Sequence, residues 1–258
     1  MAVLPLDAGY LDHGRRSNVT QSALTSHTRS TDTRWPCCPE AARREENHVA
    51  RGQTQRAAIV GVAEHGNSAV LVTVAPGGEL LDRRRIDLTD RALPTHPHHH
   101  EGSWVGRYLN IPGARALSLA DAVALVECVR TSAARGARES LEALAAAVPM
   151  PIASIAIRVW PKLPPTTEER IADNRAQTVA DSVMYREALA SAAEARGWSV
   201  HWYNPERVFR DAAEALGCAD INVFLHTMGQ SIGPPWQAKH KLAAAAALAA
   251  TLTRQIAR

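Results

Sequence analysis

Residues 57–74 read AAIVGVAEHGNSAVLVTV, and this stretch decides the fold. Two apolar runs of strand length flank a short polar break, Glu64-His65-Gly66-Asn67. Apolar runs joined by a glycine-containing break are typical of paired β-strands. Most strands end without chemically reactive groups, so a carboxylate and an imidazole at the end of so apolar a strand raise the question of a functional site.

The residues that follow continue the sheet. Ala75-Pro76-Gly77-Gly78 is a turn signal, and Glu79–Leu88 is a more polar run that suits the edge of a sheet. Three consecutive strands with short links predict an antiparallel meander. Two further strands are expected at Ile152–Val159, which is apolar and central, and at Trp198–Tyr203.

Helices alternate with the later strands. A capping box at Ser118 predicts a helix to about residue 147, and a second at Thr166 predicts a long helix to about residue 195. Further helices are expected over residues 205–216, 220–230 and 234–258. The order β-β-β-α-β-α-β-α with a C-terminal helical addition predicts an α/β fold with a mixed five-stranded sheet and right-handed crossovers.

The first part of the chain differs from the rest. Of the 258 residues, 46% are apolar and 21% are charged, which allows one good-sized domain. Residues 1–55 are rich in Ser, Thr, Arg, Asn and His and lack an apolar period, so we expect an N-terminal extension there and a domain over residues 56–258. The extension is either a disordered tail, with or without a function, or sequence included through a wrongly assigned start codon.

Charge and cysteine content narrow the class of protein. The formal net charge of +3 permits nucleic-acid binding without arguing for it. The four cysteines form no CxxC pair, so we expect neither a zinc site nor a disulfide framework. We expect a cytoplasmic location, where thiols stay reduced. No signal peptide is recognisable, and the alanine-rich run near the C-terminus is too weakly hydrophobic and too short to span a bilayer.

The order of elements resembles the three-layer ribonuclease H-like fold, and within that superfamily the RuvC-type Holliday-junction resolvases. The resemblance covers residues 57–250. It rests on AIVGVAEHGNSAVLVTV (58–74), IASIAIRV (152–159), RAQTVADSVMYREALASAAEARGWSVHWYNPERV (175–208) and AKHKLAAAAALAA (238–250). These stretches are similar to the family's first hairpin, its fourth strand, its long helix with the following strand and helix, and its final helix of small residues.

The resemblance implies metal-dependent cleavage of a DNA or RNA phosphodiester, by carboxylates that hold two divalent ions such as Mg²⁺ or Mn²⁺. Glu64 stands where the family has its first aspartate. Arg158 stands near the position of the family's glutamate, and its cation would repel a metal. Lys239, His240 and Lys241 stand where the family has an aspartate with a histidine or aspartate nearby. The resemblance therefore implies a degraded catalytic carboxylate set.

The long helix offers replacement acids. Glu169, Asp173, Gln177 and Asp181 recur every four residues and share one face, with Tyr185 a turn further on. One hypothesis takes Asp173 and Asp181 as acids that face the cleft. The alternative assigns Glu169 to the capping box and Asp173 to an ion pair on the surface.

Two further segments, one rich in histidine and one basic, are candidate binding sites for a metal or a phosphate. The loop THPHHHEGSW holds His96, His98, His99, His100 and Glu101, which are either transition-metal ligands, support for an active site through His98 or Glu101, or a solvated loop. Lys239, His240 and Lys241 oppose the dipole of the helix that they begin. A phosphate would be favoured there, and the alternative is a solvated helix start.

Two functions therefore compete. In the first, the chain is a RuvC-like, metal-dependent phosphodiesterase with an altered site, in which the catalytic residues are Glu64, Asp173, Asp181 and His240, and Glu64 and Asp173 hold the metal. In the second, the fold is catalytically inactive and binds a protein partner or branched or single-stranded DNA or RNA, with phosphate contacts from Arg158, Lys239 and Lys241. A homodimer and no membrane association are expected in both.

A simple geometric criterion separates the two functions. A second acid within about 5 Å of Glu64 would favour the nuclease, because two-metal sites need clustered carboxylates. An ion pair between Glu64 and Arg158 would favour the inactive fold. A phosphotransferase of the actin-like class is a weaker third hypothesis, since the chain is short for that class's duplicated halves.

Overall fold

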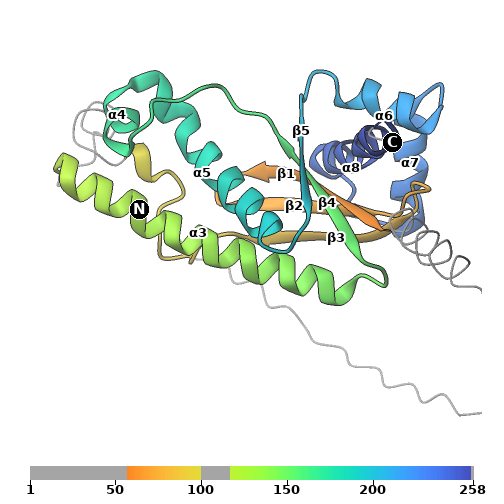
Figure 1. Cartoon of the computed structure of the whole chain (residues 1–258), viewed down its shortest axis with the longest axis horizontal. Helices are drawn as coiled ribbons and strands as arrows, with labels where there is room; N and C mark the ends of the chain where they lie inside the picture. The colour runs from red at the N-terminus through yellow and green to blue at the C-terminus, as the bar shows by residue number, and fades with distance from the viewer. Residues whose placement is uncertain (1–56, 100–116, 257–258) are drawn as a thin grey trace, which may run out of the picture. The chain divides into compact units, whose positions relative to one another are not determined.

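The computed structural model describes residues 57–99 and 117–256 (Figure 1). The predicted N-terminal extension, and His100 and Glu101 of the histidine-rich loop, lie outside the described residues. The boundary of the domain at residue 56 stays a prediction.

Five strands form one mixed sheet. The antiparallel meander consists of β1 (Ala58–His65), β2 (Ser68–Val74) and β3 (Leu80–Asp87). The strands β4 (Ile152–Arg158) and β5 (Ser199–Tyr203) are parallel to β1, and the order across the sheet is β3-β2-β1-β4-β5. The structure thus confirms the predicted α/β class, the meander and the mixed five-stranded sheet.

The hairpin of β1 and β2 closes through two residues. His65 of β1 pairs with Ser68 of β2, which leaves Gly66 and Asn67 as the turn. Gly66 has a φ of 56°, a left-handed conformation that glycine adopts without steric cost. All side chains of β2, and those of β1 up to Ala63, are buried, so both faces of these strands are covered.

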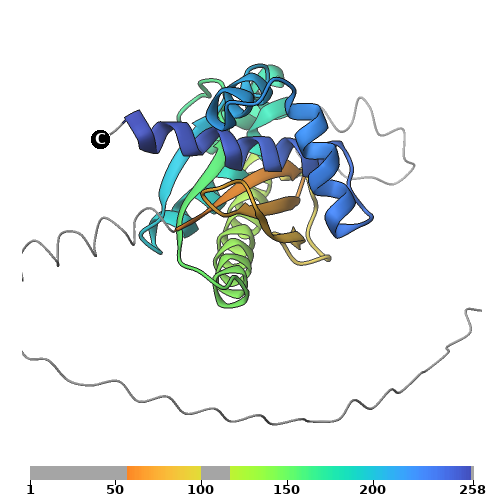
Figure 2. The same cartoon turned by 90° about the vertical axis from the view of Figure 1, so that its right-hand side faces the viewer.

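Two helical layers cover the sheet. The helices α3 (Leu119–Ala147), α4 (Thr167–Ala172) and α5 (Asn174–Glu194) share one apolar core with the sheet. The helices α6 (Val208–Leu216), α7 (Ile221–Ile232) and α8 (Ala238–Ile256) share the other. Figure 2 shows α8, in dark blue, on one side of the sheet and α3, in yellow-green, on the other. None of the described helices has the length and apolar content that a bilayer span needs.

Alanine in α8 lets this helix lie directly on the central strand. The run Ala243–Ala247 is fully buried against β1. A Cβ atom at Gly61 of β1 would overlap the backbone carbonyl of Ala243, so only glycine fits at that crossing. The small residues of α8 therefore bring the first turn of this helix next to the end of β1.

Both predicted helix starts are confirmed, and the predicted long helix is wrong in one respect. Ser118 accepts from the Asp121 N–H, and Thr166 and Glu169 form a complete capping box. The expected single helix from residue 166 to 195 is two helices, α4 and α5, which meet at Asp173. The Asp173 backbone is extended, because its side chain competes for the next free N–H groups and thereby begins a new helix.

Candidate functional site

Glu64 lies at the carboxyl end of β1, and its carboxylate is already bound by a guanidinium. Nε of Arg186, from α5, donates to Oε1 of Glu64 at 2.7 Å, and Nη2 contacts the same oxygen. The two side chains are only 6% and 8% exposed, so the ion pair is sequestered from water. Nη1 of Arg186 donates to the Val159 carbonyl at 3.2 Å, which ties the pair to the residue after β4.

A second cation is held at the same strand end. Nζ of Lys239, in the first turn of α8, donates to the backbone carbonyl of Glu64 at 2.9 Å. Close packing of α8 on β1 makes this contact possible, because the alanine run brings the start of the helix to the end of the strand. The predicted phosphate ligand Lys239 and the predicted metal ligand Glu64 are therefore neighbours.

Arg158 and Tyr203 complete the surroundings. They are opposite each other in the parallel pairing of β4 with β5, and the Tyr203 hydroxyl donates to the Val62 carbonyl at 2.8 Å. Burial raises the pKa of Tyr203, and the negative charge of Glu64 raises it further, against the positive charges of Arg158 and Arg186. Arg158 is exposed, and within the described residues it has no ion-pair partner.

We call Glu64, Arg158, Arg186 and Lys239 the strand-end cluster. It contains one carboxylate and three cations, so it carries an excess of positive charge at neutral pH. This set does not suit a divalent metal ion, which needs several oxygen ligands and is repelled by neighbouring cations. Among residues 57–99 and 117–256, moreover, no three His, Cys, Asp or Glu side chains are grouped so that they could hold a metal.

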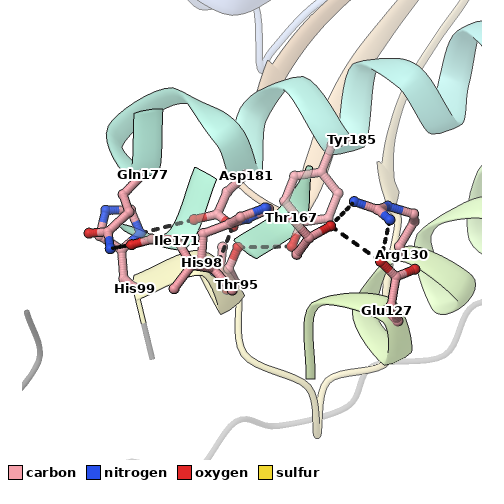
Figure 3. A network of polar contacts seen from close by, with 10 residues as sticks. All are labelled: Thr95, His98, His99, Glu127, Arg130, Thr167, Ile171, Gln177, Asp181 and Tyr185. Carbon is pink, nitrogen blue, oxygen red and sulfur yellow. Dashed lines mark hydrogen bonds and ion pairs between the residues drawn. The ribbon is translucent and has the colours of Figure 1, made fainter. Parts of the chain in front are cut away.

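Asp181, the predicted catalytic acid on α5, is engaged by the histidine-rich segment instead. Its Oδ1 lies 2.6 Å from Nδ1 of His98 and 3.2 Å from the His98 backbone nitrogen, and its Oδ2 lies 3.0 Å from Nδ1 of His99 (Figure 3). Burial favours a raised pKa at Asp181, but the hydrogen bonds from the two histidines outweigh it and hold the pKa below its ordinary value. The short helix η1 (Pro97–His99) is thus fixed to α5 by an ionised carboxylate.

The other polar residues on this face of α5 also make structural contacts. The Tyr185 hydroxyl donates to the Thr95 carbonyl at 2.8 Å, and the Gln177 side-chain amide donates to the Ile171 carbonyl (Figure 3). The four-residue spacing seen in the sequence therefore does mark one face, but that face binds α4 and the segment 95–99.

Asp173 has a different role from the one that the nuclease hypothesis gives it. Its carboxylate is exposed and accepts from the N–H groups of Arg175 at 2.7 Å and Ala176 at 3.2 Å, which caps α5. The structure therefore brings neither Asp173 nor Asp181 into contact with Glu64. The assignment of Glu64 and Asp173 to a metal stays a prediction, and this arrangement speaks against it.

His240 lies in the first turn of α8 and is 8% exposed. Its Nδ1 accepts from the Gln237 N–H at 3.1 Å, and its ring stacks on Trp236 with 5.8 Å between the ring centroids. Burial, together with the positive charge of Arg83, lowers the pKa of His240. A neutral imidazole that caps its own helix explains this residue, and no described contact joins Lys241 to the strand-end cluster.

Arg186 is the residue that the sequence analysis missed. It lies in a run of α5 in which Val183, Met184 and Tyr185 are also buried. An arginine within a buried run needs a carboxylate partner, because an isolated buried charge is too costly. That signal was visible in the sequence, but the partner is 122 residues away and cannot be read from spacing.

No family model matches this sequence, and no curated protein matches it. Among solved structures, the chain is similar to RuvC of Thermus thermophilus in complex with a Holliday junction substrate, at 14% identity, with 77% of this chain and 96% of that chain covered and a TM-score of 0.43. A second structure of Thermus thermophilus RuvC matches at 14% identity over the same shares, with a TM-score of 0.42. Both matched structures are of RuvC, the type of protein that the sequence resembles.

Proposed function

We propose that this chain is a ribonuclease H-like domain that binds DNA or RNA at the strand-end cluster and does not cleave it by a metal-dependent reaction. The ion pair between Glu64 and Arg186 is the observation that carries this proposal. Nε and Nη2 of Arg186 both contact Oε1 of Glu64 in a buried position, so a metal ion that bound this oxygen would have to displace the guanidinium.

Charge supports an anionic ligand. Arg186 neutralises Glu64, which leaves the positive charges of Arg158 and Lys239 uncompensated within the cluster. Arg158 is exposed and carries no ion pair to another described residue, so its guanidinium is available to a phosphate. Phosphodiesters carry one negative charge per nucleotide, and arginine binds them bidentately.

A metal-dependent nuclease with Mg²⁺ or Mn²⁺ is the hypothesis against which this proposal is tested. It would require Arg186 to leave Glu64 when the metal arrives. Removing one partner of a buried ion pair typically costs about 3–5 kcal/mol, because the other charge is left without compensation. Both the proposed function and the nuclease hypothesis are independent of the predicted homodimer, which stays a prediction.

The test uses the full chain with three probes: a four-way DNA junction, a single strand and an RNA–DNA hybrid. Each is incubated with Mg²⁺, with Mn²⁺ and with a chelator, and both cleavage and binding are recorded. We expect binding in all three conditions, weakened by the divalent ions only as far as they compete for the phosphates, and no cleavage. Cleavage that requires metal and disappears in Glu64→Ala would overturn the proposal, and so would the absence of any binding.

A matched pair of variants identifies the surface that binds. Arg158→Ala should weaken binding to every probe and lower the slope of log affinity against log salt by about 1, which is the change expected when one phosphate contact is lost. Arg138→Ala is the control, because Arg138 is an exposed arginine on α3, in the opposite helical layer from α8. Equal effects of the two substitutions would mean that only the net charge of the protein matters.

A further inference from the structure

An exposed tryptophan and a half-buried one form an aromatic pair near the strand-end cluster. Trp202 belongs to β5, and Trp160 is the second residue after β4. Their ring centroids are 4.6 Å apart and their planes meet at 79°, an edge-to-face arrangement. Together with Val159 they line an open hollow of about 240 Å³.

Packing of the domain does not account for this pair. Trp202 is 44% exposed and Val159 is 40% exposed, which is unusual for side chains of this size and polarity. Trp198, the residue before β5, is only 7% exposed, and the guanidinium of Arg196 lies 5.4 Å from its ring centroid. One tryptophan is therefore buried before the edge strand, and another lies on the surface within it.

The charge around the pair is positive. The segment 151–165 contains Arg158 and Lys162, both exposed, and no acidic residue. The segment 198–205 contains no acidic residue either. A surface made of aromatic rings and cations, without carboxylates, is complementary to a polyanion that carries flat rings.

The pair is joined directly to the strand-end cluster through the backbone. The Val159 carbonyl accepts from Arg186, and the Val159 N–H donates to the Tyr203 carbonyl at 3.0 Å. These two bonds fix Val159, the residue between Arg158 and Trp160, to the end of β5 and to α5. A strand of nucleic acid whose phosphates lie on Arg158 would therefore have its bases within reach of the indoles.

We infer that the hollow at Trp160 and Trp202 is a stacking site for an unpaired base of single-stranded DNA or RNA, with flanking phosphates on Arg158 and Lys162. This inference rests on the proposed function. It specifies which part of the nucleic acid the domain recognises, namely an unpaired base. Bases stack on aromatic side chains whatever their identity, because each base has a π-face. The three side chains that line the hollow offer few polar groups to read base edges, so the site discriminates single strands from duplexes and tolerates any base.

The test measures binding of the full chain to single-stranded DNA and RNA of one sequence, to the matching duplex, and to an abasic strand of equal length. Trp202→Ala should weaken binding to the two single strands about tenfold, as expected for the loss of one stacked base, and binding to the duplex less than twofold. The abasic strand should bind the wild type and Trp202→Ala equally. Binding of the single strand should quench tryptophan fluorescence in the wild type and much less in Trp202→Ala.

Two further variants keep the result interpretable. Trp202→Phe should restore most of the binding to single strands, because phenylalanine also stacks. Val223→Ala, at a residue of α7 that is 62% exposed, should change nothing and controls for the loss of an exposed apolar side chain. Circular dichroism verifies that each variant is folded.

The outcomes separate this inference from the function on which it rests. If the wild type binds no nucleic acid, both are overturned, and the aromatic pair becomes a candidate contact for a protein. If the wild type binds nucleic acid but Trp202→Ala binds single strands as tightly, or the duplex and single strands are weakened equally, the stacking site is overturned and the proposed function stands.

Discussion

Two buried carboxylates meet their partners at α5 in different ways: Asp181 belongs to this helix, and Glu64 contacts it five residues further on, at Arg186. Asp181 is held by His98 and His99, which belong to the short helix η1. Glu64 comes from the end of β1 and is held by Arg186. Both belong to the set that the sequence analysis considered for catalysis, yet only Glu64 has further cations beside it.

This difference separates a structural contact from a candidate binding site. At Asp181, one carboxylate accepts three hydrogen bonds from the segment that packs on it, so its acceptors are satisfied within the domain. At Glu64, the surrounding cations outnumber the carboxylate, and one of them, Arg158, is exposed. An excess of cations over carboxylates at a strand end is therefore the feature that indicates an anionic ligand. A buried carboxylate by itself does not indicate one.

The largest expected effect comes from breaking the ion pair at Glu64. Arg186→Met should destabilise the domain by about 3–5 kcal/mol, because the Glu64 carboxylate stays buried without its partner. Urea unfolding followed by circular dichroism measures the change. Arg175→Met, at an exposed residue of the same helix, is the control and should be neutral.

A second substitution sharpens this result. Adding Glu64→Met to Arg186→Met should recover most of the lost stability, since buried ion pairs are often replaced by apolar side chains at little cost. If the double variant is as unstable as the single one, desolvation of Glu64 is not the cause.

A smaller effect is expected at Asp181. Asp181→Asn should cost about 2 kcal/mol, because hydrogen bonds to a charged acceptor are replaced by bonds to a neutral one. Asp173→Asn, in the same helix, should be neutral because asparagine caps helices as well as aspartate does. Similar losses from both substitutions would remove the contrast between the buried and the exposed carboxylate.

The pH dependence at Asp181 follows from its lowered pKa. The unfolded carboxyl titrates near 3.8 and the folded one below that value, so its stabilisation is complete above pH 4 and is lost as the pH falls through the folded pKa. Between pH 5 and 2, the free energy of unfolding should fall less steeply with pH in Asp181→Asn than in the wild type. Parallel declines would mean that Asp181 is not held ionised by the histidines.

A weaker dependence is expected at His240, whose pKa is lowered by burial and by Arg83. Because the unfolded imidazole titrates near 6.5 and the folded one lower, its contribution is present above pH 6.5 and is lost below it. His240→Asn keeps an acceptor for the Gln237 N–H and should flatten the stability profile between pH 7.5 and 5.5. His226→Asn, at an exposed position of α7, should leave that profile unchanged.

The smallest effect on stability is expected at Arg158. Arg158→Ala should change the free energy of unfolding by less than about 0.5 kcal/mol, since exposed residues without specific contacts contribute little. Its effect on nucleic-acid binding should nonetheless be measurable. A variant that is stable but binds weakly would mark the exposed part of the strand-end cluster as functional, and a destabilised one would give Arg158 a structural role.

Much of the fold could be predicted from local patterns. The apolar runs on either side of Gly66 and Asn67 indicated the hairpin, and the serine and threonine caps indicated where α3 and α4 begin. These features depend on neighbouring residues, so their physical cause is contained in a short window of sequence. The break at Asp173 was missed because aspartate at that position is compatible both with a continuous helical face and with a new cap.

The candidate site depended on contacts between distant segments. The periodicity of α5 correctly placed Gln177, Asp181 and Tyr185 on one face, but it contained no information on which element that face would meet. His98 is 83 residues from Asp181, and Arg186 is 122 residues from Glu64. Only the packing of α5 on the sheet and on the segment 95–99 decides which charges meet.

The sequence by itself therefore determined the strands, the helix starts, the α/β class and the position of Glu64 at a strand end, because hydrogen bonding and apolar periodicity act locally. Tertiary packing determines that Glu64 meets a guanidinium, that Asp181 meets two imidazoles, and that Trp202 stays exposed beside Trp160. The physical reason is that the charge state and accessibility of a side chain depend on its neighbours in space. Those neighbours come from the far parts of the chain that the fold brings together.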